Sequence, residues 1–209
     1  MKNSNNITGK SGIFYNLLDL PFIYQTVQFL LRKFNTNSRI FSEFFVFDEN
    51  AVVLDCGCGP GNYRRYIKSR EYIGIDINEK HIAKAKRNYP DDRFVTQDLT
   101  KFDSEMIKNI DVVLMIGILH HLPDDICRNI FEDFYKKLST DGKVYCIDPV
   151  FIQNQRKVAK FLARRDKGNF VRTSESYKNL VGPMFKVESF VVSNLLRVPY
   201  DHYVMKILK

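Results

Sequence analysis

The sequence predicts an α/β protein built around a parallel sheet, and three observations lead to this prediction. Short apolar runs alternate with amphipathic stretches between Ala51 and Asp148. A glycine-rich turn follows the first of these runs. The chain ends in two strand-like runs, 186–193 and 201–208, which lie close enough in the sequence to pair as an antiparallel hairpin. Strands that alternate with helices form a parallel sheet with helices on both faces.

Composition limits the class of protein. The 209 residues, with 44% hydrophobic and 27% charged side chains, are typical of one globular domain with a small appendage. A formal net charge of +8 favours an acidic partner such as nucleic acid, an anionic small molecule or an anionic membrane surface. No apolar run reaches eighteen residues and the N-terminus lacks a secretory signal, so we expect a cytoplasmic protein without a membrane span. We expect reduced, buried thiols at Cys56, Cys58, Cys127 and Cys146.

The elements follow in order along the chain. Apolar residues recur at helical spacing in 13–47, so we expect 1–47 to be a polar tail and a helical cap. The main domain is expected to span 48–209. The apolar runs predict strands at 51–55, 72–77, 93–97, 111–117 and 143–148. The stretches between them predict helices at 62–70, 79–89, 103–109 and 124–138.

The alternation breaks after Pro149. A basic helix is expected at 153–166, with Val158, Phe161 and Leu162 as its apolar stripe. Ser174 can cap a further helix that extends to about Val181. We therefore expect an insertion at about 150–185 that covers the carboxyl ends of the strands.

The glycine-rich turn reads Asp55-Cys-Gly-Cys-Gly-Pro-Gly61 and lies between a predicted strand and a predicted helix. This is the geometry of a nucleotide-binding switch point. The dinucleotide fingerprint GxGxxG fails, because counting from Gly57 its third glycine falls on Asn62. A carboxylate at Asp55 would repel a pyrophosphate and attract an ammonium or a sulfonium. The turn therefore suits S-adenosylmethionine better than NAD.

Two further acids end the next two predicted strands. Asp76 can accept hydrogen bonds from both ribose hydroxyls, and Asp98 can accept one from the adenine amino group. Three acids at the ends of three consecutive strands form a more specific pattern than any one of them alone. The other interpretation is that all three are helix caps or turn residues.

These motifs resemble those of the class I S-adenosylmethionine-dependent methyltransferases. Asp55–Gly61 looks like their first motif, and Met115–Leu122 resembles the "LHHL" segment of the small-molecule branch. The resemblance implies a Rossmann-like, seven-stranded sheet of order 3-2-1-4-5-7-6 with the last strand antiparallel. The run from Asp166 to Thr173, followed by Tyr177, also looks like members found among bacterial surface-polysaccharide and secondary-metabolite genes. We expect the cofactor to be held by Tyr15, Asp55, Gly57, Cys58, Gly59, Gly61, Asp76, Ile77, Gln97, Asp98, Leu99 and Ile116.

The adjacent residues His120 and His121 are candidates for work on the acceptor. Neighbouring side chains diverge, so we do not expect both to bind one metal, and no Cys/His spacing fits zinc. A neutral imidazole titrates near working pH and can act as a general base. We favour His121 as the catalytic base, with Asp148 as the second candidate and His120 in the acceptor site. The alternative is that His120 supports the cofactor loop and His121 packs.

The segment after Pro149 carries candidates for acceptor recognition. Arg156 and Arg172 have guanidinium groups that suit phosphate or carboxylate, and Tyr177 lies just beyond them. The alternative is a solvated basic face on a helix that covers the site. Tyr15 and Tyr24 could close the site from the N-terminal side, where an aromatic wall suits a sulfonium.

The reaction expected from this pattern is in-line methyl transfer to an oxygen or nitrogen of a small, anionic acceptor, such as a sugar, a phosphorylated compound or a glycan intermediate. An RNA-modifying methyltransferase is the alternative. Base-amino methylators carry an Asn/Asp-Pro-Pro-aromatic run after the fourth strand, whereas this chain has Gly117-Ile-Leu-His-His. We therefore do not expect nucleic acid as the acceptor, and we expect a monomer or a homodimer.

Overall fold

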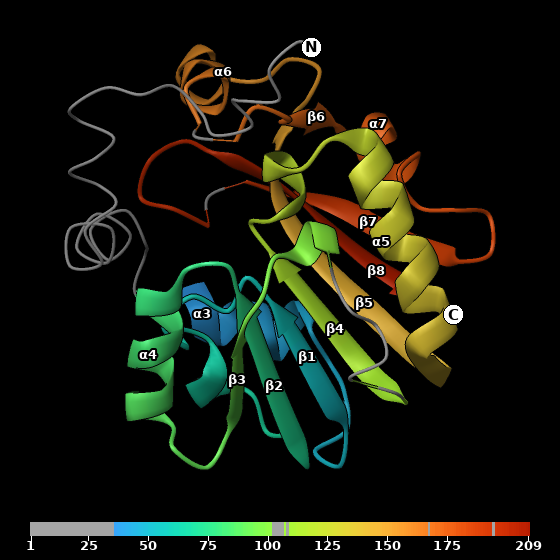
Figure 1. Ribbon diagram of the computed structural model, residues 1–209. Coiled ribbons are helices and arrows are strands. Elements are labelled where there is room, and N and C mark those ends of the chain that lie inside the picture. Colours follow the sequence, from blue (N-terminus) through green and yellow to red (C-terminus); the bar gives the residue numbers. More distant parts are fainter. Residues whose placement is uncertain (1–35, 102–106, 108, 167, 194) are drawn as a thin grey trace, which may run out of the picture.

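The computed structural model describes residues 36–101, 107, 109–166, 168–193 and 195–209. Its centre is one mixed sheet with the strand order β3-β2-β1-β4-β5-β8-β7 (Figure 1). A short additional strand, β6, pairs with β5 outside this order. None of the helices in the described part of the chain has the length and apolarity to cross a membrane.

The strands confirm the predicted order and directions. β1 to β5 are mutually parallel, and β8 runs antiparallel to both β5 and β7. Counting the long strands alone, β8 is the seventh and lies between the fifth and the sixth, which is the order 3-2-1-4-5-7-6. The strands are β1 Val52–Cys56, β2 Glu71–Asp76, β3 Arg93–Thr96, β4 Ile110–Ile116, β5 Leu138–Phe151, β6 Arg172–Thr173, β7 Lys186–Ser193 and β8 Asp201–Leu208.

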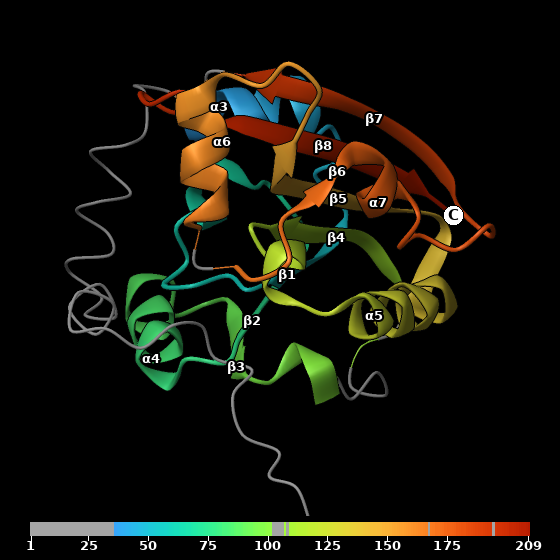
Figure 2. The ribbon, with the colours of Figure 1, turned by 90° about the horizontal axis from the view of Figure 1, so that it is seen from above.

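Two apolar clusters pack on the two faces of this sheet. Alternate residues of a strand point to opposite faces, so Leu54 belongs to one cluster and Val53 to the other. Helix α5, Asp124–Lys137, buries Cys127, Phe131 and other apolar side chains in the first cluster. Helix α4, Glu79–Asn88, and the π-helical turn η1, Ile40–Phe44, contribute side chains to the second cluster. The short helix α3, Thr36–Arg39, directly precedes η1. Figure 2 shows α5 and α3 on opposite sides of the sheet.

The first half of the chain departs from the prediction in one place. Where a helix was expected at 62–70, the structure has only a 3₁₀ turn, η2, Arg64–Tyr66. The Arg64 guanidinium donates to the Ile67 carbonyl and pairs with Asp92, which ends the turn early. Two further 3₁₀ turns, η3 Leu99–Lys101 and η5 Leu119–His121, follow β3 and β4. Most of the helix expected at 103–109, and the expected helices before residue 36, lie outside the described residues.

The segment after β5 returns over the carboxyl end of the sheet through α6, Lys157–Arg164, and α7, Ser174–Lys178 (Figure 1). The Thr173 hydroxyl, and not Ser174, caps α7 by accepting from the Ser176 N–H. The apolar stripe expected on α6 is wrong in its orientation. Ala159 and Ala163 are the buried residues of this helix, while Val158 and Phe161 are 56% and 53% exposed. Small alanines let the helix backbone approach β5 closely, which leaves the larger side chains outside.

Candidate cofactor and acceptor site

The turn after β1 takes the shape that its glycines allow. Gly57, Gly59 and Gly61 all have positive φ angles, of 73°, 56° and 80°. The Gly57 and Cys58 amides donate to the Ile75 carbonyl at 2.7 and 3.0 Å, which ties the turn to β2. A Cβ at Gly57 would lie 2.1 Å from the Ile118 Cδ1 atom, whereas a Cβ at Gly59 would meet nothing closer than 3.9 Å. The turn is therefore packed at its first glycine and open at its second.

Asp55 lies beneath this turn and not in it. Its side chain is buried, and its Oδ2 accepts the Tyr72 hydroxyl at 2.6 Å. Burial raises the pKa of Asp55 to about 7, against the effect of the hydrogen bond from Tyr72. From the sequence we expected Asp55 to attract a cationic ligand directly. In the structure this carboxyl group holds Tyr72 under the turn and is partly protonated at neutral pH.

Asp76 is the acid that borders the turn. Its Oδ2 accepts the Gly59 N–H at 2.9 Å and its Oδ1 accepts the Asn78 N–H at 2.8 Å. Burial would raise the pKa of Asp76, but His81 and these two backbone donors outweigh it and lower the pKa. Asp76 therefore stays ionised, partly exposed at the end of β2.

The residues next to Asp76 and at the end of β3 fit an adenosyl group. Ile77 is 68% exposed, although it follows a strand of buried residues. Gln97 donates its N–H to the Asp76 carbonyl at 3.0 Å, and Asp98 accepts from the N–H and hydroxyl of Thr100. An open glycine turn, an ionised acid and an exposed apolar side chain thus lie at neighbouring strand ends, where S-adenosylmethionine would be held. Tyr15 lies outside the described residues, and Ile116 is half-buried at the end of β4.

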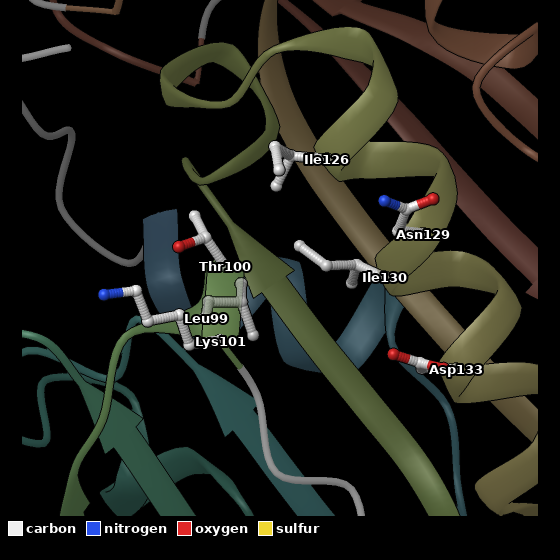
Figure 3. A pocket seen from close by; sticks show the side chains of 7 residues that line it. All are labelled: Leu99, Thr100, Lys101, Ile126, Asn129, Ile130 and Asp133. Atoms are coloured by element: carbon white, nitrogen blue, oxygen red, sulfur yellow. The ribbon is translucent and has the colours of Figure 1, made fainter. Parts of the chain in front are cut away.

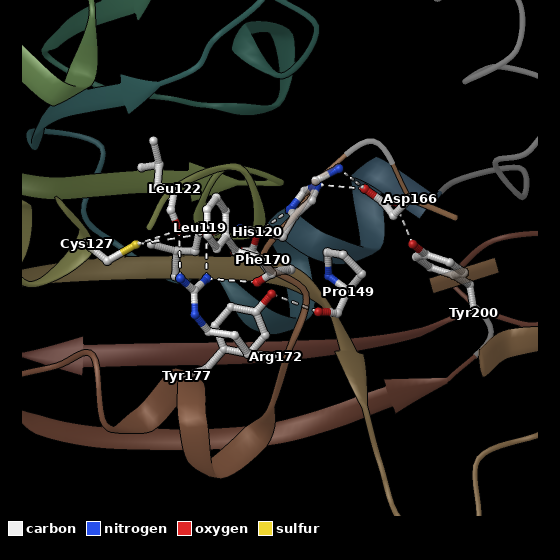
Figure 4. Close-up of polar contacts among 12 residues, drawn as sticks. Leu119, His120, Leu122, Cys127, Pro149, Asp166, Phe170, Arg172, Tyr177 and Tyr200 are labelled. Carbon is white, nitrogen blue, oxygen red and sulfur yellow. Dashed lines mark hydrogen bonds and ion pairs between the residues drawn. The ribbon is translucent and has the colours of Figure 1, made fainter. Parts of the chain in front are cut away.

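His120 lies at the carboxyl ends of β4 and β5, between two carboxylates (Figure 4). Its Nδ1 is 2.6 Å from the Asp148 Oδ1, which also accepts the His120 N–H at 3.1 Å. Its Nε2 is 3.2 Å from the Asp166 Oδ1. Asp166 in turn accepts the Tyr200 hydroxyl at 2.6 Å and the Gly168 N–H at 2.9 Å. Three segments of the chain, at His120, Asp148 and Asp166, therefore meet at one imidazole, and Tyr200 adds a fourth through Asp166.

This arrangement fixes the protonation of His120. Burial lowers the pKa of a histidine, but the hydrogen bonds and charges of Asp148 and Asp166 outweigh that effect and raise the pKa of His120 to about 9. The same contacts hold the pKa of Asp166 well below its usual range. His120 is therefore an imidazolium at neutral pH, with a carboxylate on each ring nitrogen.

Arg172 and Tyr177 are buried partners of the same region, with their polar groups turned inward (Figure 4). Arg172 donates to the carbonyl oxygens of Leu119, Leu122 and Phe170 and to Asp124. The Tyr177 hydroxyl donates to the Pro149 carbonyl at 3.0 Å. Both residues were predicted to contact the acceptor. The structure gives them internal partners. Arg172 holds the loop that carries His120, and Tyr177 binds strand β5.

The remaining predicted residues are accessible. His121 is exposed, and its ring centroid lies 4.1 Å from that of His120. Arg156 is exposed at the start of α6. Sequence reasoning missed Asp166 and Tyr200. One signal could have pointed to Asp166, since it is the only acid between Asp148 and Glu175.

A small pocket of about 100 Å³ lies between η3 and α5 (Figure 3). Of the predicted site residues, only Leu99 is in its wall. It is lined by Leu99, Thr100, Lys101, Ile126, Asn129, Ile130 and Asp133. This pocket is thus separate from the His120 cluster. Within the described ranges, no group of three or more acidic, histidine or cysteine side chains is arranged to hold a metal ion.

Part of the chain is similar to known methyltransferases. Residues 53–142 match the family model described as a methyltransferase domain. The putative methyltransferase 235L of Invertebrate iridescent virus 6 is 25% identical over 134 residues, which is 62% of this chain and 49% of that protein. The trans-aconitate 2-methyltransferase of Escherichia coli K12 is 33% identical over 76 residues, or 34% of this chain and 29% of that enzyme. The chain thus spans half or less of the length of these curated relatives.

A solved structure shows the same fold over nearly the whole chain. It is the phosphoethanolamine N-methyltransferase 2 of Haemonchus contortus, in complex with phosphomonomethylethanolamine and S-adenosylhomocysteine. The TM-score is 0.72 at 14% identity, and the match covers 95% of this chain and 60% of that one. The sheet order is that of the class I, S-adenosylmethionine-dependent methyltransferase fold. Within this chain, the match to the methyltransferase domain model covers residues 53–142.

Proposed function

We propose that this protein transfers a methyl group from S-adenosylmethionine to an oxygen or nitrogen of a small, anionic acceptor. The observation that carries the proposal is the shared edge where β1 and β2 end. There the open turn at Gly59 lies beside the ionised Asp76 and the exposed Ile77. S-adenosylmethionine supplies the activated methyl group, and the chain supplies alignment of the acceptor, which can contribute about 7–11 kcal/mol in model reactions.

Two observations support an anionic acceptor. Helix α6 and the residue before it present exposed cations, and α6 lies above the carboxyl ends of the strands (Figure 1). These cations are Arg156, Lys157, Lys160 and Arg164. One curated relative is named for methylation of trans-aconitate, which is an anion. Arg172 contributes indirectly, because it fixes the loop that bears His120.

The proton chemistry is assigned to the loop after β4. We place His120 and Asp148 together as the pair that handles a proton from the acceptor, because Asp148 binds both the backbone N–H and Nδ1 of His120. His121, which the sequence favoured as the catalytic base, is exposed beside it and is now the second candidate for that role.

Calorimetric titration with S-adenosylmethionine, S-adenosylhomocysteine and NADH tests the cofactor. We expect micromolar binding of the first two ligands, loss of that binding in Asp76→Ala, and retention in Glu132→Ala, which changes an exposed acid on α5. Tight binding of NADH in their place would contradict the proposal. Turnover of methyl-labelled cofactor with carboxylates, sugar phosphates and RNA then identifies the acceptor class. Methylation of RNA alone would favour the RNA-modifying alternative.

A further inference from the structure

Asp166 contacts His120 but belongs neither to the predicted site nor to the cofactor edge. We propose that Asp166 is a displaceable partner of His120, and that an acceptor hydroxyl replaces its carboxylate at Nε2, which frees His120 to act as a general base. This inference rests on the proposed function and deepens it, since it specifies an acceptor that is methylated on a hydroxyl oxygen.

The first step concerns the two ring nitrogens. Each nitrogen of His120 faces a carboxylate oxygen, at 2.6 Å for Asp148 and 3.2 Å for Asp166. An imidazolium that donates to two carboxylates has no lone pair with which to accept a proton. A base at this position therefore requires that one of the two carboxylates leaves.

The second step identifies which carboxylate can leave. Asp148 lies inside β5, between β4 and β8, and its side chain is 2% exposed. Asp166 follows α6 in a connecting segment, and its side chain is 24% exposed. Its other contacts are the Tyr200 hydroxyl and the Gly168 N–H, which it can exchange for water. Asp166 is therefore the mobile partner and Asp148 the fixed one.

The third step shows that the exchange needs no large movement. The Phe170 N–H donates to the His120 carbonyl at 3.0 Å, and a Cβ at Gly168 would lie 2.1 Å from the His120 Cδ2 atom. The backbone at Gly168 and at Phe170 is thus packed against His120. Rotation of the Asp166 side chain alone uncovers Nε2.

The proton balance then follows. With Asp166 withdrawn, the pKa of His120 falls and its Nε2 proton passes to solvent. Neutral His120 then accepts the proton of the acceptor hydroxyl at Nε2, and the acceptor oxygen keeps the electron pair of the broken O–H bond. Asp148 remains on Nδ1 and stabilises the imidazolium that forms. The other titratable or charged groups around this pair are His121, Cys127, Cys146, Arg172, Tyr177 and Tyr200.

The test measures His120 itself. In the full chain labelled with ¹⁵N-histidine, NMR titration gives the pKa of His120, and diethyl pyrocarbonate gives the reactivity of its neutral ring. We expect Asp166→Asn to lower that pKa by about 1–3 units, and to speed modification of His120 at pH 7 about tenfold or more. Tyr200→Phe, which removes one hydroxyl from Asp166, should change both quantities in the same direction but less. Asp92→Asn, a control in the ion pair with Arg64, should change neither.

The two measurements together distinguish a displaceable Asp166 from a fixed one. An unchanged pKa in Asp166→Asn would show that Asp166 does not hold the proton on His120. A lowered pKa without faster modification would show that Nε2 stays covered, which also overturns the proposal. If Asp166→Asn does not fold, Tyr200→Phe decides between the same outcomes. Calorimetric binding of S-adenosylhomocysteine is measured on each variant, so failure of the cofactor assignment is seen separately.

Discussion

Arg172 and Asp124 join the two-residue strand β6 to the start of α5, through hydrogen bonds of 2.9 and 2.6 Å from Nε and Nη2 to the Asp124 Oδ1. The remaining donors of Arg172 satisfy carbonyl groups of the loop between β4 and α5. The Arg172 guanidinium therefore fixes the loop that positions His120.

These contacts predict that Arg172 stabilises the folded protein. We expect Arg172→Ala to lower the free energy of unfolding by about 2–4 kcal/mol, because buried carbonyl groups lose their donors. Asp124→Ala should cost less, since Asp124 is half exposed. Urea denaturation measures both variants, with Lys186→Ala on the exposed edge strand β7 as the control. A loss below about 0.5 kcal/mol for Arg172→Ala, which is typical of a surface change, would contradict this role.

The glycine turn provides a matched pair of substitutions. Gly57→Ala should lower the stability of the fold more than Gly59→Ala, because its Cβ would lie 2.1 Å from the Ile118 Cδ1 atom, which must move. Gly59→Ala meets open space, so it should fold at a cost of about 1–2 kcal/mol for the left-handed backbone. We expect Gly59→Ala to weaken binding of S-adenosylhomocysteine at least about tenfold, since the methyl group enters the open cradle. Thermal melting and calorimetry measure the two effects. Unchanged affinity in a folded Gly59→Ala would place the ligand elsewhere.

The raised pKa of Asp55 predicts one part of the pH dependence of the free energy of unfolding. Its pKa is raised by burial to about 7 in the folded protein, so the folded state binds a proton more tightly than the unfolded state. For an acid shifted in this direction, stability is greatest below the unfolded pKa of about 4 and falls as the pH rises to 7. We expect Asp55→Asn to flatten this fall. Urea denaturation between pH 4 and 8 checks it, and parallel curves for the variant and the native chain would refute it.

His120 predicts a second fall in stability with rising pH, at higher pH than that of Asp55. Its pKa is raised to about 9, so its contribution is complete below about pH 6.5 and is lost as the pH rises through 9. We expect stability to fall by about 2–4 kcal/mol across this window, and His120→Gln to remove most of that fall. His81→Gln, at the opposite end of the site beside Asp76, is the control. Denaturation curves at pH 6, 8 and 10 give the slope, and an equal slope in His120→Gln would exclude His120 as its source.

The strands were the part of the fold that the sequence pattern predicted best, because short apolar runs and turn residues recur along the chain. The order of the strands in the sheet was implied by the resemblance to class I methyltransferases, and the structure confirms it. The prediction of a helix at 62–70 was wrong because it used only the local pattern of residues. The Arg64–Asp92 ion pair that shortens this segment joins residues that are far apart in the chain. The prediction of which face of α6 is buried was wrong for a similar reason. Hydrophobicity alone predicted that Phe161 would be buried, but the helix lies close to β5 and buries Ala159 and Ala163 in its place.

The residues of the candidate site also differ in whether a local sequence pattern could predict them. The turn at Gly59 and the acid at Asp76 were predictable, because each stands at a strand end in a recognisable spacing. The pairing of His120 with Asp148 was not, although both residues were named, because it depends on the register of β4 against β5. The contact of Tyr200 with Asp166 joins two irregular segments, for which a sequence pattern gives no distance.

Ile118 connects the two halves of the site. Its side chain fills the space where a Cβ of residue 57 would lie, so the loop after β1 and the loop after β4 interlock. His120 is two residues further along the second loop. A shift of the first loop on ligand binding would therefore displace the Ile118 side chain and, through it, the loop that carries the imidazole. Binding of the cofactor at the glycine turn and protonation of His120 are then linked in a thermodynamic cycle. The dissociation constant of S-adenosylhomocysteine should therefore vary with pH through the titration of His120.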